Sequence, residues 1–311
     1  MMAGDAREVT GTIFDIDETA IHDGPGVRMT VYLKGCPLTC AWCHSPESQR
    51  REPEIVWFES RCTHCGACVN VCPQRARRPG LIDPEDRARC VMCGACIEAC
   101  PAGAIEVRGR EVTAGEIADR AQRLMPFFRR TGGGVTLTGG EPTAQPDFAH
   151  AIAGLCHEAD IHVAMETCGF APWETLERLA EVVDLWLYDV KHPDAAVHEE
   201  LTGASNELIL ANLRRLIEGG AQGTADGRPP VIVRVPLIPG VNDDEATFGE
   251  LARMVAGLGA GRMELLPFNP ATGGKYSWVG LPHPMPAAKR QSPEAIARLA
   301  AICEECGLEV L

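Results

Sequence analysis

The sequence has no excess of positive charge and no long apolar run. Its 311 residues include 29 Lys and Arg against 43 Asp and Glu, a formal net charge of −14. A field of that sign repels phosphate and excludes nucleic acid as the main partner. No apolar run reaches the roughly 20 residues of a membrane helix, and residues 1–10 lack the pattern of a secretory signal. We expect a cytoplasmic protein without membrane contact, and a hydrophobic fraction of 45% indicates a globular enzyme.

Cysteine, by contrast, is abundant, at 15 residues. Because the cytoplasm keeps thiols reduced, a disulfide framework is excluded, and close cysteine spacing indicates a metal site or catalysis. Most of the cysteines lie in three tight groups. The groups are Cys36, Cys40 and Cys43; Cys62, Cys65, Cys68 and Cys72; and Cys90, Cys93, Cys96 and Cys100.

The second and third groups repeat one motif, C-x2-C-x2-C-x3-C-P, in CTHCGACVNVCP and CVMCGACIEACP. The motif is that of bacterial two-cluster ferredoxins, in which the fourth cysteine of each run binds the other cluster. The sequence therefore predicts two 4Fe-4S clusters. Their expected ligands are Cys62, Cys65, Cys68 and Cys100 for one, and Cys72, Cys90, Cys93 and Cys96 for the other. A pair of zinc sites is the alternative, but four-cysteine zinc sites use two pairs set well apart.

The first group differs, because Cys36-x3-Cys40-x2-Cys43 offers only three thiolates. Three thiolates hold three irons of a cubane and leave the fourth iron open to bind and reduce another molecule. An irregular zinc knuckle or loose thiols would be the alternative.

This loop and further motifs in the same order resemble the radical S-adenosylmethionine (SAM) superfamily and, within it, the activating enzymes of glycyl radical enzymes. The resemblance covers residues 11–311, and the ferredoxin-type insert resembles the larger subgroup of these activating enzymes. Its motifs, beyond the cysteine loop, are Asp23-Gly24-Pro25-Gly26, Gly132-Gly133-Gly134, Gly139-Gly140-Glu141-Pro142, Glu166-Thr167-Cys168-Gly169, Asp189-Val190-Lys191 and Glu264-Leu265-Leu266-Pro267-Phe268.

The resemblance implies an α/β fold, a partial (β/α)6 TIM-like barrel of residues 1–51 and 109–311. Residues 52–108 are then an inserted two-cluster ferredoxin-like α+β domain, with joints expected near 51–53 and 107–112. The residue pattern agrees, since apolar, β-rich runs alternate with amphipathic stretches. Strands are expected at Met29–Leu33, Gly134–Thr138, Ile161–Met165, Leu185–Tyr188, Val231–Val235 and Met263–Leu266, and helices at Asp147–Glu158, Glu174–Val182, Ser205–Glu218, Asp244–Leu258 and Pro293–Cys306.

Two local signals add detail to this pattern. Thr113 and Glu116 form a capping box that opens a helix with Ile117, Ala121, Leu124, Met125 and Phe128 on its apolar face. The Gly- and Pro-rich segment Gly219–Pro230 is expected to be a surface connection.

The resemblance also implies residue roles. Cys36, Cys40 and Cys43 are the expected catalytic cluster ligands, and the Asp23–Gly26 loop is expected to hold the partner. The remaining residues are expected to bind SAM: Trp42, Cys43, His44, Gly139, Gly140, Glu141, Asp189, Val190, Lys191 and Asn269. Asn269 departs from the family, since many members have a histidine after Leu-Leu-Pro-Phe, and asparagine cannot titrate.

The implied reaction is reductive cleavage of SAM to methionine and a 5′-deoxyadenosyl radical, which takes a hydrogen from a glycine Cα of a partner glycyl radical enzyme. The implied cofactors are SAM and three 4Fe-4S clusters, and the electron donor is flavodoxin or ferredoxin. We expect a monomer that works anaerobically.

Two other functions share these cysteine groups. A radical SAM enzyme acting on another peptide or a small molecule could use the two extra clusters as a relay. A ferredoxin-type electron carrier would have no use for an open iron. Of the other four cysteines, Cys156, Cys303 and Cys306 lie on apolar helical faces and are expected in the core, and Cys168 is given no role.

Overall fold

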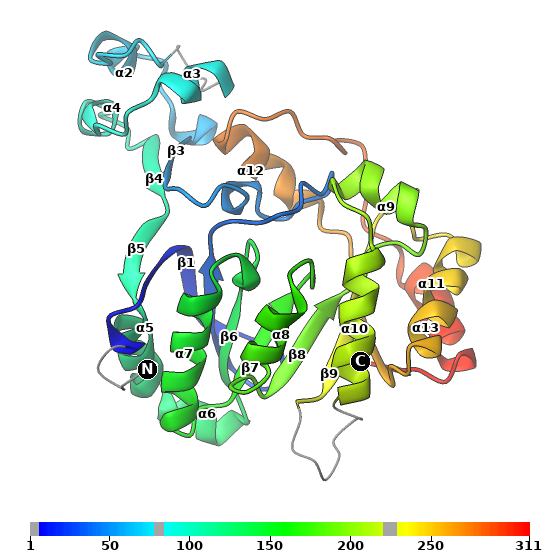
Figure 1. Ribbon diagram of the computed structural model, residues 1–311. Coiled ribbons are helices and arrows are strands. Elements are labelled where there is room, and N and C mark those ends of the chain that lie inside the picture. Colours follow the sequence, from blue (N-terminus) through cyan, green and yellow to red (C-terminus); the bar gives the residue numbers. More distant parts are fainter. Residues whose placement is uncertain (1–5, 78–83, 220–228) are drawn as a thin grey trace.

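The computed structural model describes residues 6–77, 84–219 and 229–311, and its main body is a mixed α/β sheet with helices outside it (Figure 1). Within these ranges the sheet has nine strands in the order β11-β10-β9-β8-β7-β6-β2-β1-β5. Six strands that follow one another in this order are parallel to each other. They are β2 (Arg28–Leu33), β6 (Gly134–Gly139), β7 (Val163–Thr167), β8 (Leu185–Asp189), β9 (Val231–Leu237) and β10 (Arg262–Pro267).

All six predicted strands are therefore confirmed, and their order along the sheet is consistent with the predicted partial barrel. One boundary was wrong, since β7 begins at Val163 rather than Ile161. Ile161 N still donates a hydrogen bond to Cys156 O in the preceding helix, and Asp160 turns the chain with φ 57°. The strand starts only after that turn.

Three strands extend the sheet beyond the prediction. β1 (Thr10–Ala20) pairs antiparallel with β2, β5 (Arg110–Thr113) pairs antiparallel with the far side of β1, and β11 (Glu309–Val310) adds a short parallel strand beside β10. The sheet is consequently mixed.

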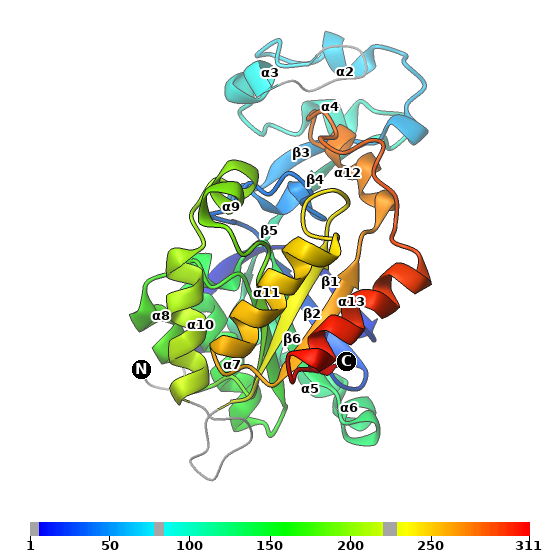
Figure 2. The same cartoon turned by 90° about the vertical axis from the view of Figure 1, so that its right-hand side faces the viewer.

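Helices cover the outer face of the sheet (Figures 1 and 2). The outward side chains of β2, β6, β7, β8 and β9 form the core with them, whereas Thr30, Glu166 and Arg234 alternate with core residues and point to the inner face. The covering helices are α5 (Ala114–Arg123), α7 (Pro146–Glu158), α8 (Trp173–Leu179), α10 (Glu207–Gly219), α11 (Glu245–Gly257) and α13 (Pro293–Glu305). α9 (Ala195–Thr202) and α12 (Gly273–Trp278) lie beyond the carboxyl ends of the strands (Figure 1). Short 3-10 turns occupy Pro46–Ser48 (η1), Glu59–Arg61 (η2), Pro142–Ala144 (η3) and Pro270–Thr272 (η4).

The Thr113 cap is confirmed, because its side chain accepts a hydrogen bond from Glu116 N. The single helix expected from it is wrong. α5 ends at Arg123 and α6 (Met125–Thr131) starts anew, so Phe128 belongs to α6. Pro126 in the first turn of α6 cannot donate a backbone hydrogen bond to the preceding turn, and this interrupts the ladder.

The segment that the sequence sets apart as an insert forms its own two-stranded sheet. β3 (Glu54–Trp57) pairs antiparallel with β4 (Ile105–Arg108), and α2 (Ala67–Asn70), α3 (Pro84–Arg89) and α4 (Ala95–Glu98) lie between them in the chain. This part projects beyond the main sheet (Figures 1 and 2). The stretch 107–112, expected to be a joint, holds the end of β4 and most of β5, with Gly109 between them at φ 105°. Of the expected connection Gly219–Pro230, residues 220–228 lie outside the described residues. No described helix is long and apolar enough to cross a membrane.

Candidate functional site

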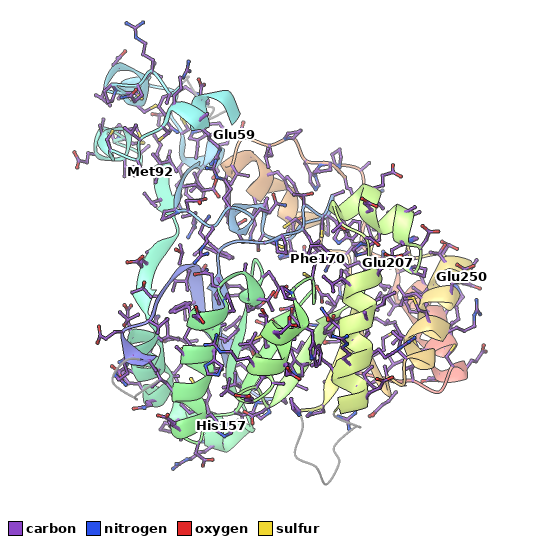
Figure 3. The ribbon with its side chains drawn as sticks, viewed as in Figure 1. Glu59, Met92, His157, Phe170, Glu207 and Glu250 are labelled. Atoms are coloured by element: carbon purple, nitrogen blue, oxygen red, sulfur yellow. The ribbon has the colours of Figure 1, made fainter. Side chains whose placement is uncertain are left out.

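The predicted cluster loop and SAM residues gather at one edge of the sheet. The cysteine loop follows β2, Gly139 ends β6, Asp189 ends β8 and Asn269 follows β10. Because these strands are parallel, their carboxyl ends meet at the same edge, where barrel enzymes build their sites. Phe170, which follows β7, lies at this edge and packs on the same buried cluster as Cys36 and Cys40 (Figure 3).

Backbone hydrogen bonds tie the cysteine loop to its neighbours. Glu141 N donates to Gly35 O at 2.8 Å, and Gly140 N donates to Leu33 O at 2.7 Å. On the other side, Thr39 N donates to Thr202 O at 2.8 Å, at the end of α9. The loop is thus fixed between the end of β6 and α9.

Two glycines allow this close approach. Gly139 has φ 110°, and a Cβ there would lie 2.4 Å from Leu33 N. A Cβ on Gly140 would lie 2.4 Å from Gly35 O. Any larger residue at either position would push the cysteine loop away from β6.

The three cysteines of the loop are partly buried. Burial raises the pKa of Cys36, Cys40 and Cys43, that of Cys43 to about 11. Cys36 and Cys40 pack on the same buried cluster, and Cys43 N donates a hydrogen bond to Cys40 O at 3.0 Å, so the three residues lie close together. In residues 6–77, 84–219 and 229–311, no three His, Cys, Asp or Glu side chains converge as ligands of a single metal ion. A cubane takes one thiolate on each iron, so its ligands surround a space rather than meet at a point.

The Glu141 carboxylate is almost fully buried and joins the ends of two strands. Its Oε1 accepts hydrogen bonds from Thr143 N (3.0 Å), Thr143 Oγ1 (2.9 Å) and Thr167 Oγ1 (2.8 Å). Its Oε2 accepts one from Cys168 N at 2.8 Å. An Oε2 with one such bond can still accept another.

Asp189 and Lys191 form a buried ion pair beside the cysteine loop. Lys191 Nζ lies 2.6 Å from Asp189 Oδ2. Burial alone would lower the pKa of Lys191, but Asp189 and then Cys40 outweigh it, so this pKa is raised and the amine stays charged. Asp189 Oδ1 is buried and accepts no hydrogen bond from any described residue. A buried carboxylate oxygen without a donor fits a ligand that brings a hydroxyl or an amine.

Four other residues predicted to bind SAM lie in or near the same loop. Trp42 is buried against Ile238 and Phe268. His44 Nε2 lies 3.2 Å from Asn269 Nδ2, and Asn269 Oδ1 caps the 3-10 turn η4. Val190, which lies between Asp189 and Lys191 in the chain, is buried.

The Asp23–Gly26 loop lies at the opposite end of the strands, before β2. It packs on the Gly132–Gly134 run, because a Cβ on Gly133 would lie 1.8 Å from Val27 O. Asp23 Oδ2 accepts a hydrogen bond from Thr30 Oγ1 at 2.7 Å on the inner face of the sheet. A large cavity opens beside this loop. Its lining includes Ile21, His22, Gly24, Pro25, Leu187, Ile232 and Glu264.

The two ferredoxin-type runs enclose two separate hollows in the insert. The first hollow is lined by Cys62, Cys65, Cys68 and Cys100. The second hollow is lined by Cys72, Cys90, Cys93 and Cys96. The fourth cysteine of each run thus lines the hollow of the other run, as the ferredoxin pattern predicts. Gly66 and Gly94, with φ 74° and 81°, make the equivalent turns before α2 and α4.

The remaining cysteines on helices lie in or against the core, as their apolar helical faces predict, and Cys168 is buried too. Cys156 and Cys303 are fully buried in the core, and Cys306 packs against it. Cys168 is also buried, and its pKa is raised by burial and then by Glu141. It packs near Cys36 and Cys40, at the edge of the site.

Sequence reasoning missed one charged residue in the inner face. Arg234 on β9 is buried between Glu166, at 3.3 Å, and Glu264, at 3.0 Å. Burial lowers its pKa, but the two carboxylates raise it further, so the guanidinium stays charged. A single arginine within the apolar strand VIVRVPL was the signal available in the sequence.

Comparison with known proteins agrees with this geometry. The Radical SAM superfamily model matches residues 30–252. The choline trimethylamine-lyase activating enzyme of Oleidesulfovibrio alaskensis is 41% identical over 284 residues, 88% of either chain. This chain belongs to the glycyl-radical-enzyme activating enzymes of the radical SAM superfamily.

Other relatives support the same membership. The trans-4-hydroxy-L-proline dehydratase activating enzyme of Clostridioides difficile is 39% identical over 94% of this chain and 95% of its own. A radical SAM methyltransferase from Sphaerobacter thermophilus shares the fold, with a TM-score of 0.51 at 19% identity over 96% of this chain and 76% of that one. Membership of the family implies SAM, a 4Fe-4S cluster and a glycyl radical enzyme as partner.

Proposed function

We propose that this activating enzyme cleaves SAM at a 4Fe-4S cluster held by Cys36, Cys40 and Cys43 and transfers a hydrogen from a glycine of its partner. The observation that supports this most strongly is a pair of hydrogen bonds, from Gly140 to Leu33 at the end of β2 and from Glu141 to Gly35 at the start of the cysteine loop. They hold the three thiols against the strand end where the SAM motif lies.

When bound, the cluster supplies the electron that breaks the S–C5′ bond of SAM, giving methionine and the 5′-deoxyadenosyl radical that takes hydrogen from the glycine Cα. The residues of the chain bind and orient the reactants around this step. Lys191 stays protonated and would hold the methionyl carboxylate. Asp189 Oδ1, which lacks a donor, would accept a hydroxyl of the ribose.

The amino and adenine ends of SAM would contact the remaining motif residues. Glu141 Oε2 and the backbone of Gly139 and Gly140 would accept the methionyl amine. Trp42 and His44 would lie on the nucleoside side, with Asn269 held beside His44. A proton relay through Asn269 is not part of this proposal, since an amide does not titrate.

The glycine-bearing loop of the partner would enter from the opposite end, through the cavity beside Asp23–Gly26. The cavity lies where Gly24 and Pro25 face Leu187 and Ile232 of the inner sheet face. A glycine loop is slim and exposes backbone, and it would extend from this cavity along the inner face of the sheet to bring its Cα towards SAM.

The insert, residues 52–108, would be a separate domain with two further 4Fe-4S clusters. The two cysteine-lined hollows support this ligand assignment. Backbone N–H groups already point at the sulfurs, from Ala76 to Cys72 and from Ala104 to Cys100, each at 3.3 Å. Flavodoxin or ferredoxin would supply the electrons. The chain would act as a monomer in the reducing cytoplasm, where its cysteines stay out of disulfides.

The test is quantification of 5′-deoxyadenosine after anaerobic reconstitution, reduction with dithionite and addition of SAM. Cys40→Ala should abolish the product, whereas Cys306→Ala, which removes a thiol against the core, should leave it. Equal product from Cys40→Ala and wild type would contradict the assignment of the loop. The partner is then found by assaying several glycyl radical enzymes, beginning with a choline trimethylamine-lyase and a trans-4-hydroxy-L-proline dehydratase.

A further inference from the structure

One side chain lies between the two cysteine-lined hollows of the insert. Arg77 lines the first hollow, with Cys62, Cys65, Cys68 and Cys100, and it also lines the second, with Cys72, Cys90, Cys93 and Cys96. Among the described residues, no other side chain belongs to both linings. Each hollow otherwise has its own wall, formed by Trp57 in the first and Ile55 in the second.

Arg77 is a buried cation without a counter-charge from the described chain. Only 6% of its surface is exposed. Its Nε and Nη1 are buried and donate to no described group. Taking a guanidinium out of water without a partner is strongly unfavourable, so such an arrangement indicates that a negative group completes it.

The charge of Arg77 reaches the cysteine sulfurs. Arg77 lines both hollows together with their cysteines, so the guanidinium lies beside both sets of expected ligands. A 4Fe-4S cluster with four thiolates carries net negative charge, and its reduction adds one more electron. A fixed positive charge beside the cluster stabilises the reduced form more than the oxidised form, which raises the reduction potential.

We propose that Arg77 is a shared positioning charge that raises the reduction potentials of both insert clusters together. Each cluster then accepts one electron from a low-potential flavin or iron–sulfur protein, with no proton or bond exchanged. This inference rests on the proposed presence of clusters in the two hollows. A single residue would thus raise the reduction potentials of two clusters, each of which takes its ligands from both cysteine runs.

The test compares three variants of the reconstituted holoenzyme by anaerobic redox titration followed by electron paramagnetic resonance. Arg77→Gln removes the charge, Arg77→Lys keeps it, and Arg75→Gln removes the same charge from an exposed position two residues away. Arg77→Gln should shift the reduction equilibrium of both insert clusters about ten-fold towards the oxidised form. For a one-electron couple this lowers each reduction potential by about 59 mV. Arg77→Lys and Arg75→Gln should stay near wild type. The cluster of Cys36, Cys40 and Cys43 serves as the internal reference and should not move.

Several outcomes overturn the inference. They are unchanged potentials in a fully loaded Arg77→Gln protein, a shift in only one of the two clusters, and an equal fall in Arg77→Lys. If Arg77→Gln loses its clusters, Arg77→Lys decides: retention at wild-type potentials supports the charge, and a matching loss refutes it. Iron and sulfide content separates this inference from the proposed function, because a wild-type chain that binds a single cluster and still cleaves SAM refutes the insert clusters and this inference but not the proposed reaction.

Discussion

Replacing Glu141 by Gln tests whether this carboxylate holds the ends of β6 and β7 together. Thr143 and Thr167 donate three hydrogen bonds to Oε1, and Cys168 N donates one to Oε2. An amide has one acceptor oxygen, so its NH2 group must face at least one of these donors. Hydrogen bonds to charged groups contribute about 1.5–3 kcal/mol each. Losing the Cys168 bond and weakening the other three should lower the free energy of unfolding by about 3–5 kcal/mol.

The assay is urea unfolding of the reconstituted protein under anaerobic conditions, followed by circular dichroism. With a slope of about 3 kcal/mol/M, the midpoint should fall by about 1 M or more. Glu177→Gln, on the exposed side of α8, is the matched control and should change the free energy by less than about 0.5 kcal/mol. A Glu141→Gln midpoint equal to that of this control would refute the inference that the chain itself engages the carboxylate.

Three further changes probe other parts of the site. Lys191→Met should weaken SAM binding by at least about ten-fold, measured by calorimetry, because it leaves the buried Asp189 unpaired. Burial opposes the charge on Lys191 but Asp189 outweighs it, so the folded pKa lies above the unfolded value of about 10.4. The stabilisation by the Lys191–Asp189 pair is complete below that pH and is lost only as the pH rises through the folded pKa of Lys191. The loss of SAM affinity in Lys191→Met should therefore be equal at pH 7 and pH 9, and a difference would contradict this reasoning. Glu54→Gln weakens the buried ion pair with Lys34, 3.1 Å long, that anchors β3 to the end of β2, and should cost about 3 kcal/mol in the same urea assay; a midpoint at the wild-type value would argue against this anchor. Cys100→Ala should remove the cluster of the first hollow and spare that of the second, as electron paramagnetic resonance would show; loss of the second cluster alone would contradict the crossed assignment.

The parallel strands could be predicted because each is a short, continuous apolar run. Val231–Leu237 and Leu185–Asp189 are buried on both faces, as the sequence indicates. β1 escaped prediction because acidic residues such as Asp15 and Asp17 alternate along it. It is antiparallel and half exposed, so its pattern is that of a polar segment.

The cysteine loop and the expected SAM residues follow parallel strands and therefore lie at one edge of the sheet, but their contacts could not be predicted. The Glu141 network needs Thr167 and Cys168 beside it, and only the pairing of β6 with β7 brings them there. Similarly, nothing in the sequence places Arg77 between two hollows, because that position depends on how the two cysteine runs fold against each other.

The most direct test of the proposed reaction follows the hydrogen itself. A partner glycyl radical enzyme labelled with deuterium at the glycine Cα is incubated anaerobically with the reduced activating enzyme and SAM. We predict a glycyl radical on the partner by electron paramagnetic resonance and one deuterium in the 5′-deoxyadenosine by mass spectrometry. Formation of 5′-deoxyadenosine without deuterium and without a partner radical, across the glycyl radical enzymes assayed, would contradict the proposed hydrogen transfer.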